Sequence, residues 1–166
     1  MVTKMGWRRE EAGVAMIEVM IAIVVVSFGL LGVAGLQLAG MKASQVSYYR
    51  SVATSQAYDI ADRMRANMQG VAAGKFDAVT VALPTLPSCN PYGSSGCVAT
   101  DMATHDIHAW LIANGRLLPS GIGTITKVAN SNAFNIQVGW SEKCLDNDPS
   151  CPTGAVTRTF STQFMP

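Results

Sequence analysis

The hydrophobic residues of the chain are concentrated in one long block near the N-terminus, and beyond it apolar and polar positions are mixed as in a soluble domain. Residues 19–36 contain one polar side chain, that of Ser27, in 18 positions. About 20 helical residues cross the roughly 30 Å hydrocarbon core of a bilayer, so this block predicts a membrane-spanning helix. Residues 14–41 contain no lysine or arginine, whereas three basic residues precede them. This asymmetry favours a cytoplasmic N-terminus.

The helical pattern continues beyond the apolar block. Apolar residues recur at positions 49, 53, 57, 60, 64 and 68, the spacing of one helix face. No proline precedes Pro84, so nothing forces a kink, and Gly70 and Gly74 are stop signals. We therefore predict one helix of about 50 residues over 14–69, with its first half in a membrane and its second half (42–69) packed on a globular head. Asp59 and Arg63, four residues apart, form a favourable pair on it.

The remainder of the chain predicts a short helix and a sheet. Residues 70–100 are rich in Pro, Gly and Ser and predict an irregular connection with one short strand at 79–83. A short helix is expected over 104–114, ended by Asn114-Gly115. Strands are expected at 123–128, 133–141 and 155–164, with a hairpin turn at 130–132. A long helix packed on an antiparallel sheet is an α+β fold.

Composition and charge exclude several functions. The net charge is +1, and residues 14–166 hold nine basic and nine acidic residues. This balance, with the basic residues scattered from Lys42 onward, gives no electrostatic footprint for nucleic acid. Serines are plentiful, but none lies in a nucleophile-elbow pattern. We expect neither enzymatic activity nor a nucleic-acid partner.

The four cysteines form two close pairs around turn-rich loops. Cys89 and Cys97 bracket seven residues, and Cys144 and Cys151 bracket six. Such loops predict local disulfides, Cys89–Cys97 and Cys144–Cys151, formed in an oxidising compartment. One disulfide with two free thiols, and reduced or metal-bound thiols, are the alternatives.

Other candidate ligand residues give weaker signals. His105 and His108 are three residues apart beside Asp101 and Asp106, but nothing identifies the third protein ligand that a catalytic zinc ion needs. Residues 146–148 (Asp-Asn-Asp) offer oxygens to calcium but lack the length and the glycine of a calcium loop. A solvated turn is the better interpretation, and no metal or cofactor is predicted.

Glu18 lies inside the apolar block, where a carboxylate is costly and therefore indicates a function. The run Gly13-Val14-Ala15-Met16-Ile17-Glu18 resembles the prepilin cleavage motif, with valine where phenylalanine is usual. No A-x-A site follows the block, as a conventional signal peptide would require. The resemblance implies a leader over 1–13, a membrane and filament-core segment over 14–41, and a periplasmic head over 42–166. It also implies a prepilin peptidase that cuts between Gly13 and Val14 and methylates the new amino group of Val14.

Two further strings, residues 27–37 and 57–67, are similar to PilV-like minor pilins of type IV pili. This resemblance implies the type IV pilin-like fold and a structural, low-copy subunit that helps to initiate pilus assembly. The implied partners are other minor pilins, the major pilin and a tip adhesin, with Glu18 pairing with a neighbour's amino terminus. The implied location is the inner membrane and then the extracellular pilus. A minor pseudopilin of a type II secretion system has the same motif and is the alternative.

Overall fold

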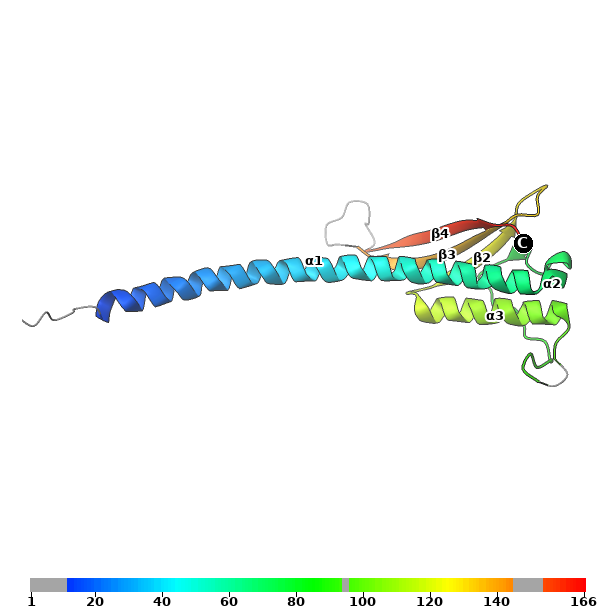
Figure 1. Cartoon of the computed structure of the whole chain (residues 1–166), viewed down its shortest axis with the longest axis horizontal. Coiled ribbons are helices and arrows are strands. Elements are labelled where there is room, and N and C mark those ends of the chain that lie inside the picture. The colour runs from blue at the N-terminus through cyan, green and yellow to red at the C-terminus, as the bar shows by residue number, and fades with distance from the viewer. Residues whose placement is uncertain (1–11, 94–95, 145–153) are drawn as a thin grey trace, which may run out of the picture. The chain divides into compact units, whose positions relative to one another are not determined.

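The computed structural model describes residues 12–93, 96–144 and 154–166, with side chains from residue 16 onward. The chain divides into two compact units, Met1–Ser44 and Gln45–Pro166, and the second is called the head below. Helix α1 (Ala12–Ala66) contributes to both units (Figure 1). The predicted single long helix is therefore confirmed.

The end of α1 differs from the predicted end at residue 69. Asn67 leaves the helical conformation, and its side-chain oxygen accepts a hydrogen bond from the Gly70 N–H at 3.0 Å. It thereby caps a second short helix, α2 (Met68–Ala72). Asparagine is among the best N-cap residues, which explains the break. Gly74, at φ +73°, turns the chain after α2 as the stop signal predicted.

The head contains a four-stranded antiparallel sheet in the order β1-β2-β3-β4. Its strands are β1 (Ala78–Val79), β2 (Ile122–Lys127), β3 (Phe134–Lys143) and β4 (Ala155–Phe164). The three longer strands confirm the predicted strands to within two residues at each end. The prediction for β1, over 79–83, was too long, because the Thr80 hydroxyl accepts the Ala82 N–H at 3.4 Å and diverts the backbone from the ladder.

Helix α3 (Ala99–Leu117) is longer at both ends than the predicted 104–114. At its start the Val98 carbonyl accepts the N–H groups of Asp101 and Met102, and an acidic side chain in the first turn is favourable. Asn114-Gly115 does not end the helix as predicted. Leu118 ends it instead, in an extended conformation, because a residue before proline disfavours the helical region.

The core lies between one face of the sheet and the two helices α1 and α3. Alternate residues of β3, namely Phe134, Ile136, Val138 and Trp140, are buried on this face. They pack in one cluster with the predicted stripe of α1, of which Ala53, Ala57, Ile60 and Met64 are buried. The other face carries mainly Asn, Gln, Ser and Thr side chains. The head is thus a two-layer α+β structure, as predicted.

Trp110 fixes α3 to helix α1 and to strand β2. Its indole N–H donates to the Gln56 carbonyl of α1 at 2.8 Å, and its ring lies so close to Gly123 of β2 that a Cβ there would meet it at 2.5 Å. Only glycine allows this approach of helix and strand. The side chain itself is fully buried.

Candidate functional site

The first half of α1 exposes apolar side chains on every side. Phe28, Leu31 and Leu36 are 69–75% exposed. Within Met16–Ala66 the helix is long and apolar enough to cross a membrane, and none of that apolar stretch is buried. A helix that is apolar all round is stable only when it is surrounded by lipid or by other apolar helices. This half of α1 therefore has the character of a membrane or assembly segment.

Glu18 is the one charged residue between positions 16 and 41 and lies exposed in the second turn of α1. The hydroxyl of the polar Ser27 donates a hydrogen bond to the Ile23 carbonyl at 2.7 Å, so the hydrogen-bonding need of this side chain is met within the helix. Glu18 has no comparable partner among the described residues. In an apolar surrounding its carboxylate needs a cation from another molecule or from the chain terminus.

Gly13 and Val14 lie in the first turn of α1, whose backbone begins at Ala12. The helix therefore contains the peptide bond that the sequence motif marks for cleavage. Its N-terminal neighbours, residues 1–11, lie outside the described part of the chain. The separation of Val14 from Glu18, four residues, is about 6 Å along the helix axis.

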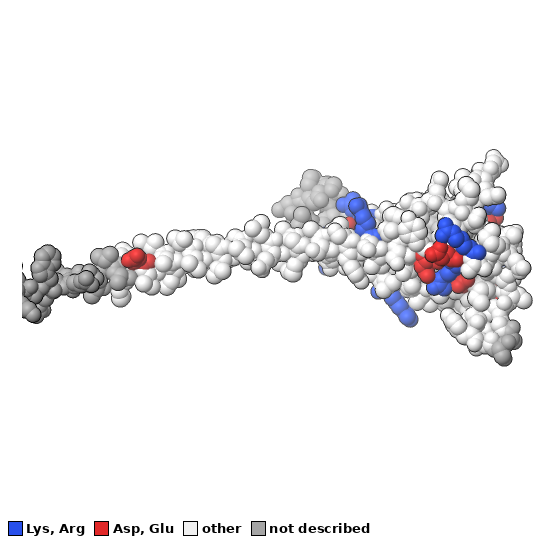
Figure 2. Space-filling view, viewed as in Figure 1, with Lys and Arg blue, Asp and Glu red and all other residues white. Residues whose placement is uncertain are grey.

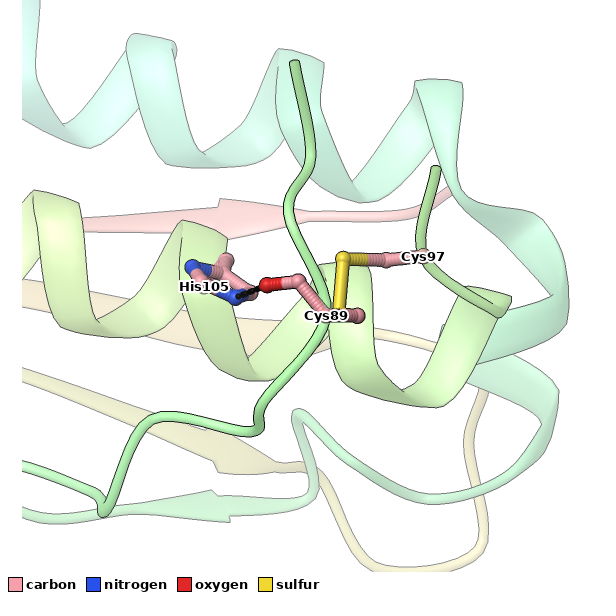
Figure 3. A group of neighbouring side chains, drawn as sticks. All are labelled: Cys89, Cys97 and His105. Carbon is pink, nitrogen blue, oxygen red and sulfur yellow. Dashed lines mark hydrogen bonds between the residues drawn. A yellow bond between two sulfur atoms is a disulfide. The ribbon is translucent and has the colours of Figure 1, made fainter. Parts of the chain in front are cut away.

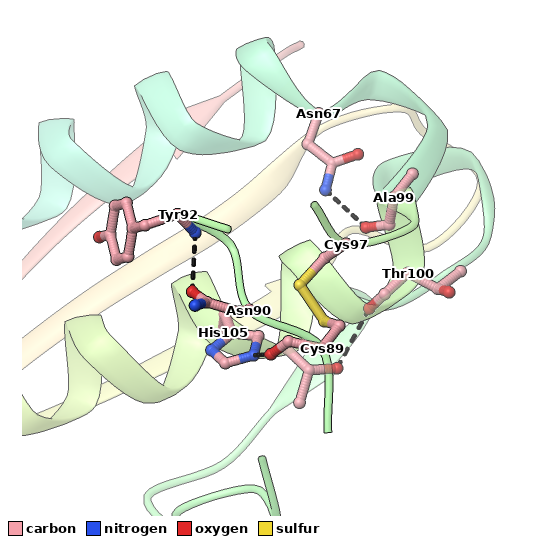
Figure 4. The surroundings of a disulfide bond; sticks show 9 residues. Asn67, Cys89, Asn90, Tyr92, Cys97, Ala99, Thr100 and His105 are labelled. Atoms are coloured by element: carbon pink, nitrogen blue, oxygen red, sulfur yellow. Dashed lines mark hydrogen bonds between the residues drawn. A yellow bond between two sulfur atoms is a disulfide. The ribbon is translucent and has the colours of Figure 1, made fainter. Parts of the chain in front are cut away.

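A disulfide joins Cys89 and Cys97, as the cysteine spacing predicted. It closes a loop that follows the irregular segment after β1 and leads into α3 (Figure 4). Asn67, at the end of α1, donates its amide to the Ala99 carbonyl at 2.7 Å and so ties the loop's exit to the long helix. Tyr92 in the loop is 97% exposed. The second predicted disulfide, Cys144–Cys151, lies outside the described residues, because Cys151 does.

The two histidines hold the irregular segment against α3. A ring nitrogen of His105 bonds to the Cys89 carbonyl at 3.2 Å, and one of His108 bonds to the Pro84 carbonyl at 3.0 Å. His105 also lies within 4.8 Å of both sulfur atoms (Figure 3). Those sulfurs are already joined to each other, and the histidines act as donors to backbone. Sequence alone suggested ligand chemistry for these two side chains and missed this role.

A cluster of ion pairs joins α1 to α3. The Arg63 guanidinium bonds to Asp59 at 2.9 Å and to Asp106 of α3 at 3.0 Å. Burial alone would lower the pKa of Arg63, but its bonds to the two carboxylates outweigh this and raise it. Burial raises the pKa of Asp106, and the bond to Arg63 offsets this only in part. The Asp59–Arg63 pair was predicted from its spacing, whereas Asp106 was named only as a neighbour of the histidines.

Residues 146–148, the weak calcium candidate, lie outside the described residues. The described ends of their segment are joined by the Cys144 N–H, which donates to the Gly154 carbonyl at 3.2 Å.

Comparison with known proteins gives a match to a protein-family model. Residues 35–108 match the family model described as Tt1218-like, type IV pilin Tt1218. The match runs from the end of the apolar block through the second half of α1, α2 and β1 into α3, and it does not include Gly13, Val14 or Glu18. No curated protein and no solved structure matches the chain. With its long apolar helix packed on an antiparallel sheet and its disulfide-closed loop, the chain has a type IV pilin-like fold and is similar to the type IV pilin Tt1218 family.

Proposed function

We propose that the chain is a minor pilin, a low-copy structural subunit of a type IV pilus that helps to initiate its assembly. The observation that carries the proposal is the first half of α1, apolar on every side and continuous with a head of pilin-like fold. Such a helix needs either lipid or a bundle of like helices around it. A pilin subunit meets both in turn, because it waits in the inner membrane and is then inserted into the filament core.

The proposed mechanism is non-catalytic for this chain. A prepilin peptidase removes residues 1–13 and methylates Val14. The new amino group is a cation at the start of the helix, and Glu18 of the neighbouring subunit is its partner. Residues 42–166 lie in the periplasm before assembly and face outward in the pilus. The partners are other minor pilins and the major pilin, with a tip adhesin as a further candidate.

The register role of Glu18 can be tested in whole cells. We expect Glu18→Leu to be cleaved and inserted in the membrane normally but to be strongly depleted from sheared pili, because hydrophobic insertion is intact while the charge pair is lost. Ser27→Ala is the matched control, since it removes the other polar side chain of the same segment, whose hydroxyl is bonded within the helix. Normal incorporation of Glu18→Leu would refute the role of Glu18.

The minor-pilin assignment has its own test. The wild-type subunit should be found in the sheared pilus fraction together with other minor pilins. Absence from that fraction, combined with loss of protein secretion when the subunit is deleted, would instead indicate a pseudopilin of a type II secretion system.

A further inference from the structure

A group of three side chains in the head has the composition of a metal site. A nitrogen of His105 and the sulfur atoms of Cys89 and Cys97 lie within 4.8 Å of one another. Thiolate sulfur and imidazole nitrogen are the ligands that zinc prefers in proteins. Among the described residues this is the one set of three histidine, cysteine or acidic side chains close enough together to hold an ion. A disulfide joins two of the three ligands, so the site exists only while that bond is open.

The positions of the three side chains fit a tetrahedral zinc ion. Zinc lies about 2.3 Å from sulfur and about 2.0–2.1 Å from nitrogen, so two ligands of one ion are roughly 3.5–3.8 Å apart. Since the present distances do not exceed 4.8 Å, His105 has to approach the sulfurs by only about 1 Å. The Cα atoms of Cys89 and Cys97 are 5.3 Å apart. Rotation of the two reduced side chains therefore brings their sulfurs to the required spacing without a movement of the backbone.

His105 is already oriented towards the loop by a hydrogen bond. One of its ring nitrogens bonds to the Cys89 carbonyl at 3.2 Å, as Figure 3 shows. A neutral ring that donates from one nitrogen has a lone pair on the other, and bonds of this kind to backbone carbonyls orient the histidines of metal sites. Helix α3 begins at Ala99, two residues after Cys97. The helix therefore holds both Cys97 and His105 near their places as ligands.

The neighbouring carboxylates are poor competitors for the same ion. Asp59, Asp62 and Asp106 are each bonded to an arginine, and Figure 2 shows acidic and basic side chains mixed in one cluster on the face that it draws. His108 bonds to the Pro84 carbonyl and does not belong to the group of three ligands. A zinc ion at the start of α3 would therefore be held by the two thiolates and one imidazole.

We propose that the reduced loop binds one zinc ion through Cys89, Cys97 and His105, with water in the fourth position. The newly made chain carries its cysteines as thiols, and the ion displaces two protons from them. When the disulfide forms, the two thiolates give two electrons to the disulfide of an oxidoreductase, which takes up two protons and becomes a dithiol. The zinc ion then leaves, because only His105 remains to hold it. Zinc binding of this kind is independent of whether the chain assembles into a pilus.

The bound ion would favour the native pairing of the first two cysteines. The three ligands lie within residues 89–105, and Cys144 follows His105 by 39 residues in the chain. The site is therefore complete before the second pair of cysteines has been made. Four cysteines allow three different pairings. A zinc ion that holds Cys89 beside Cys97 slows their reaction with the second pair until the oxidoreductase closes the native disulfide.

The first test uses the full-length chain in detergent micelles, reduced with a phosphine and titrated with zinc sulfate. Alkylation with iodoacetamide and peptide mapping measure the protection of each cysteine, and we expect zinc to protect Cys89 and Cys97. His105→Gln keeps an amide donor for the Cys89 carbonyl. It should raise the zinc concentration for half protection by at least about tenfold, the lower limit for the loss of even an outer-shell partner. His108→Gln, the matched control on the same helix, should leave that concentration unchanged.

Cobalt(II) provides an independent measurement in the full-length variant Cys144→Ser/Cys151→Ser, which keeps only the thiols of Cys89 and Cys97. A thiolate-to-cobalt absorption band should appear at one cobalt ion per reduced chain, disappear on addition of zinc and be absent from the oxidised chain. Absence of both the band and the zinc protection would overturn the proposal. So would equal protection in the wild type and His105→Gln, or protection of Cys144 and Cys151 alone, because neither result would need the site at the start of α3.

Discussion

Adding one methyl group at Gly123 tests how closely α3 is held against the sheet. A Cβ on this residue would lie 2.5 Å from Cη2 of Trp110 and 2.6 Å from Nδ2 of Asn114. Carbon atoms in contact prefer about 3.5–4.0 Å, so the indole would have to retreat by about 1 Å. It cannot do so freely, because its N–H is bonded to the Gln56 carbonyl and its ring is fully buried. Overpacking of this kind costs about 1–3 kcal/mol, and we expect Gly123→Ala to lie in the upper half of that range.

A second substitution isolates the contact. Trp110→Phe removes the ring atoms that oppose Gly123 and the hydrogen bond to Gln56, at a cost of about 2 kcal/mol from lost burial and bonding. With the clash gone, Gly123→Ala should cost less than about 1 kcal/mol in this background, which gives a coupling energy of at least about 1 kcal/mol. Gly115→Ala is the control, because the nearest atom to its Cβ lies at 3.8 Å. This substitution within α3 should stabilise the head by about 0.5–1 kcal/mol.

Urea unfolding of the full chain in detergent micelles provides the measurement. Near-UV circular dichroism should be followed, since it reports aromatic packing in the head rather than helix content. Additive costs for Gly123→Ala and Trp110→Phe would refute the reasoning, because they would mean that the two residues do not constrain each other. A cost below about 0.5 kcal/mol for Gly123→Ala alone would also refute it, because the added methyl group would then meet no resistance from Trp110.

Three other predictions follow from the site. The mature chain should begin at Val14 with an N-methyl group, and intact-mass analysis of membrane-extracted protein decides this; a start after residue 36 would restore a conventional signal peptide. Because burial raises the pKa of Asp106, its protonation favours the folded state. As the pH falls from 6 to 4, the free energy of unfolding of the wild type should therefore rise relative to that of Asp106→Asn. Urea titrations that give the same difference between the two proteins at every pH would contradict this. The double variant Cys89→Ser/Cys97→Ser opens a loop of about nine residues and should lower the free energy of unfolding by about 2.5 kcal/mol in the chain-entropy model. A double variant with the same free energy of unfolding as the wild type in urea titrations would contradict a stabilising role of the disulfide.

Local signals in the sequence were sufficient for the long helix and the first disulfide. The stripe from Tyr49 to Met64 repeats over several turns, so its period is unambiguous. The pairing of Cys89 with Cys97 needed only a short loop between them. The helix ends were less well predicted: Asn67 caps α2, and Gly115 is simply helical. At such positions an asparagine or a glycine is compatible both with a continuing helix and with a helix end, and the tertiary contacts around it decide between the two.

The roles of the histidines required the tertiary path of the chain. His108 bonds to Pro84, 24 residues earlier, and His105 bonds to Cys89, 16 residues earlier. Contacts across such sequence separations leave no periodic pattern in the sequence. From the sequence alone, therefore, the two histidines could be interpreted only as a possible pair of metal ligands. The same limit applies to Asp106, which reaches Arg63 across 43 residues. The motif from Gly13 to Glu18, in contrast, was found in sequence alone, and the structure adds the apolar surface around it.

The placement of β3 and β4 after the long helix sets the time at which the head can form. Phe134 and Phe164, which belong to the same core as Met64, follow it in the chain by 70 and 100 residues. At about 5–20 residues per second, synthesis of that stretch leaves the stripe of α1 without its sheet for roughly 5–20 s. Small domains fold in microseconds to seconds. For this protein, therefore, synthesis rather than folding decides when the head appears, and the growing chain must be kept from aggregating until its C-terminal strand is complete.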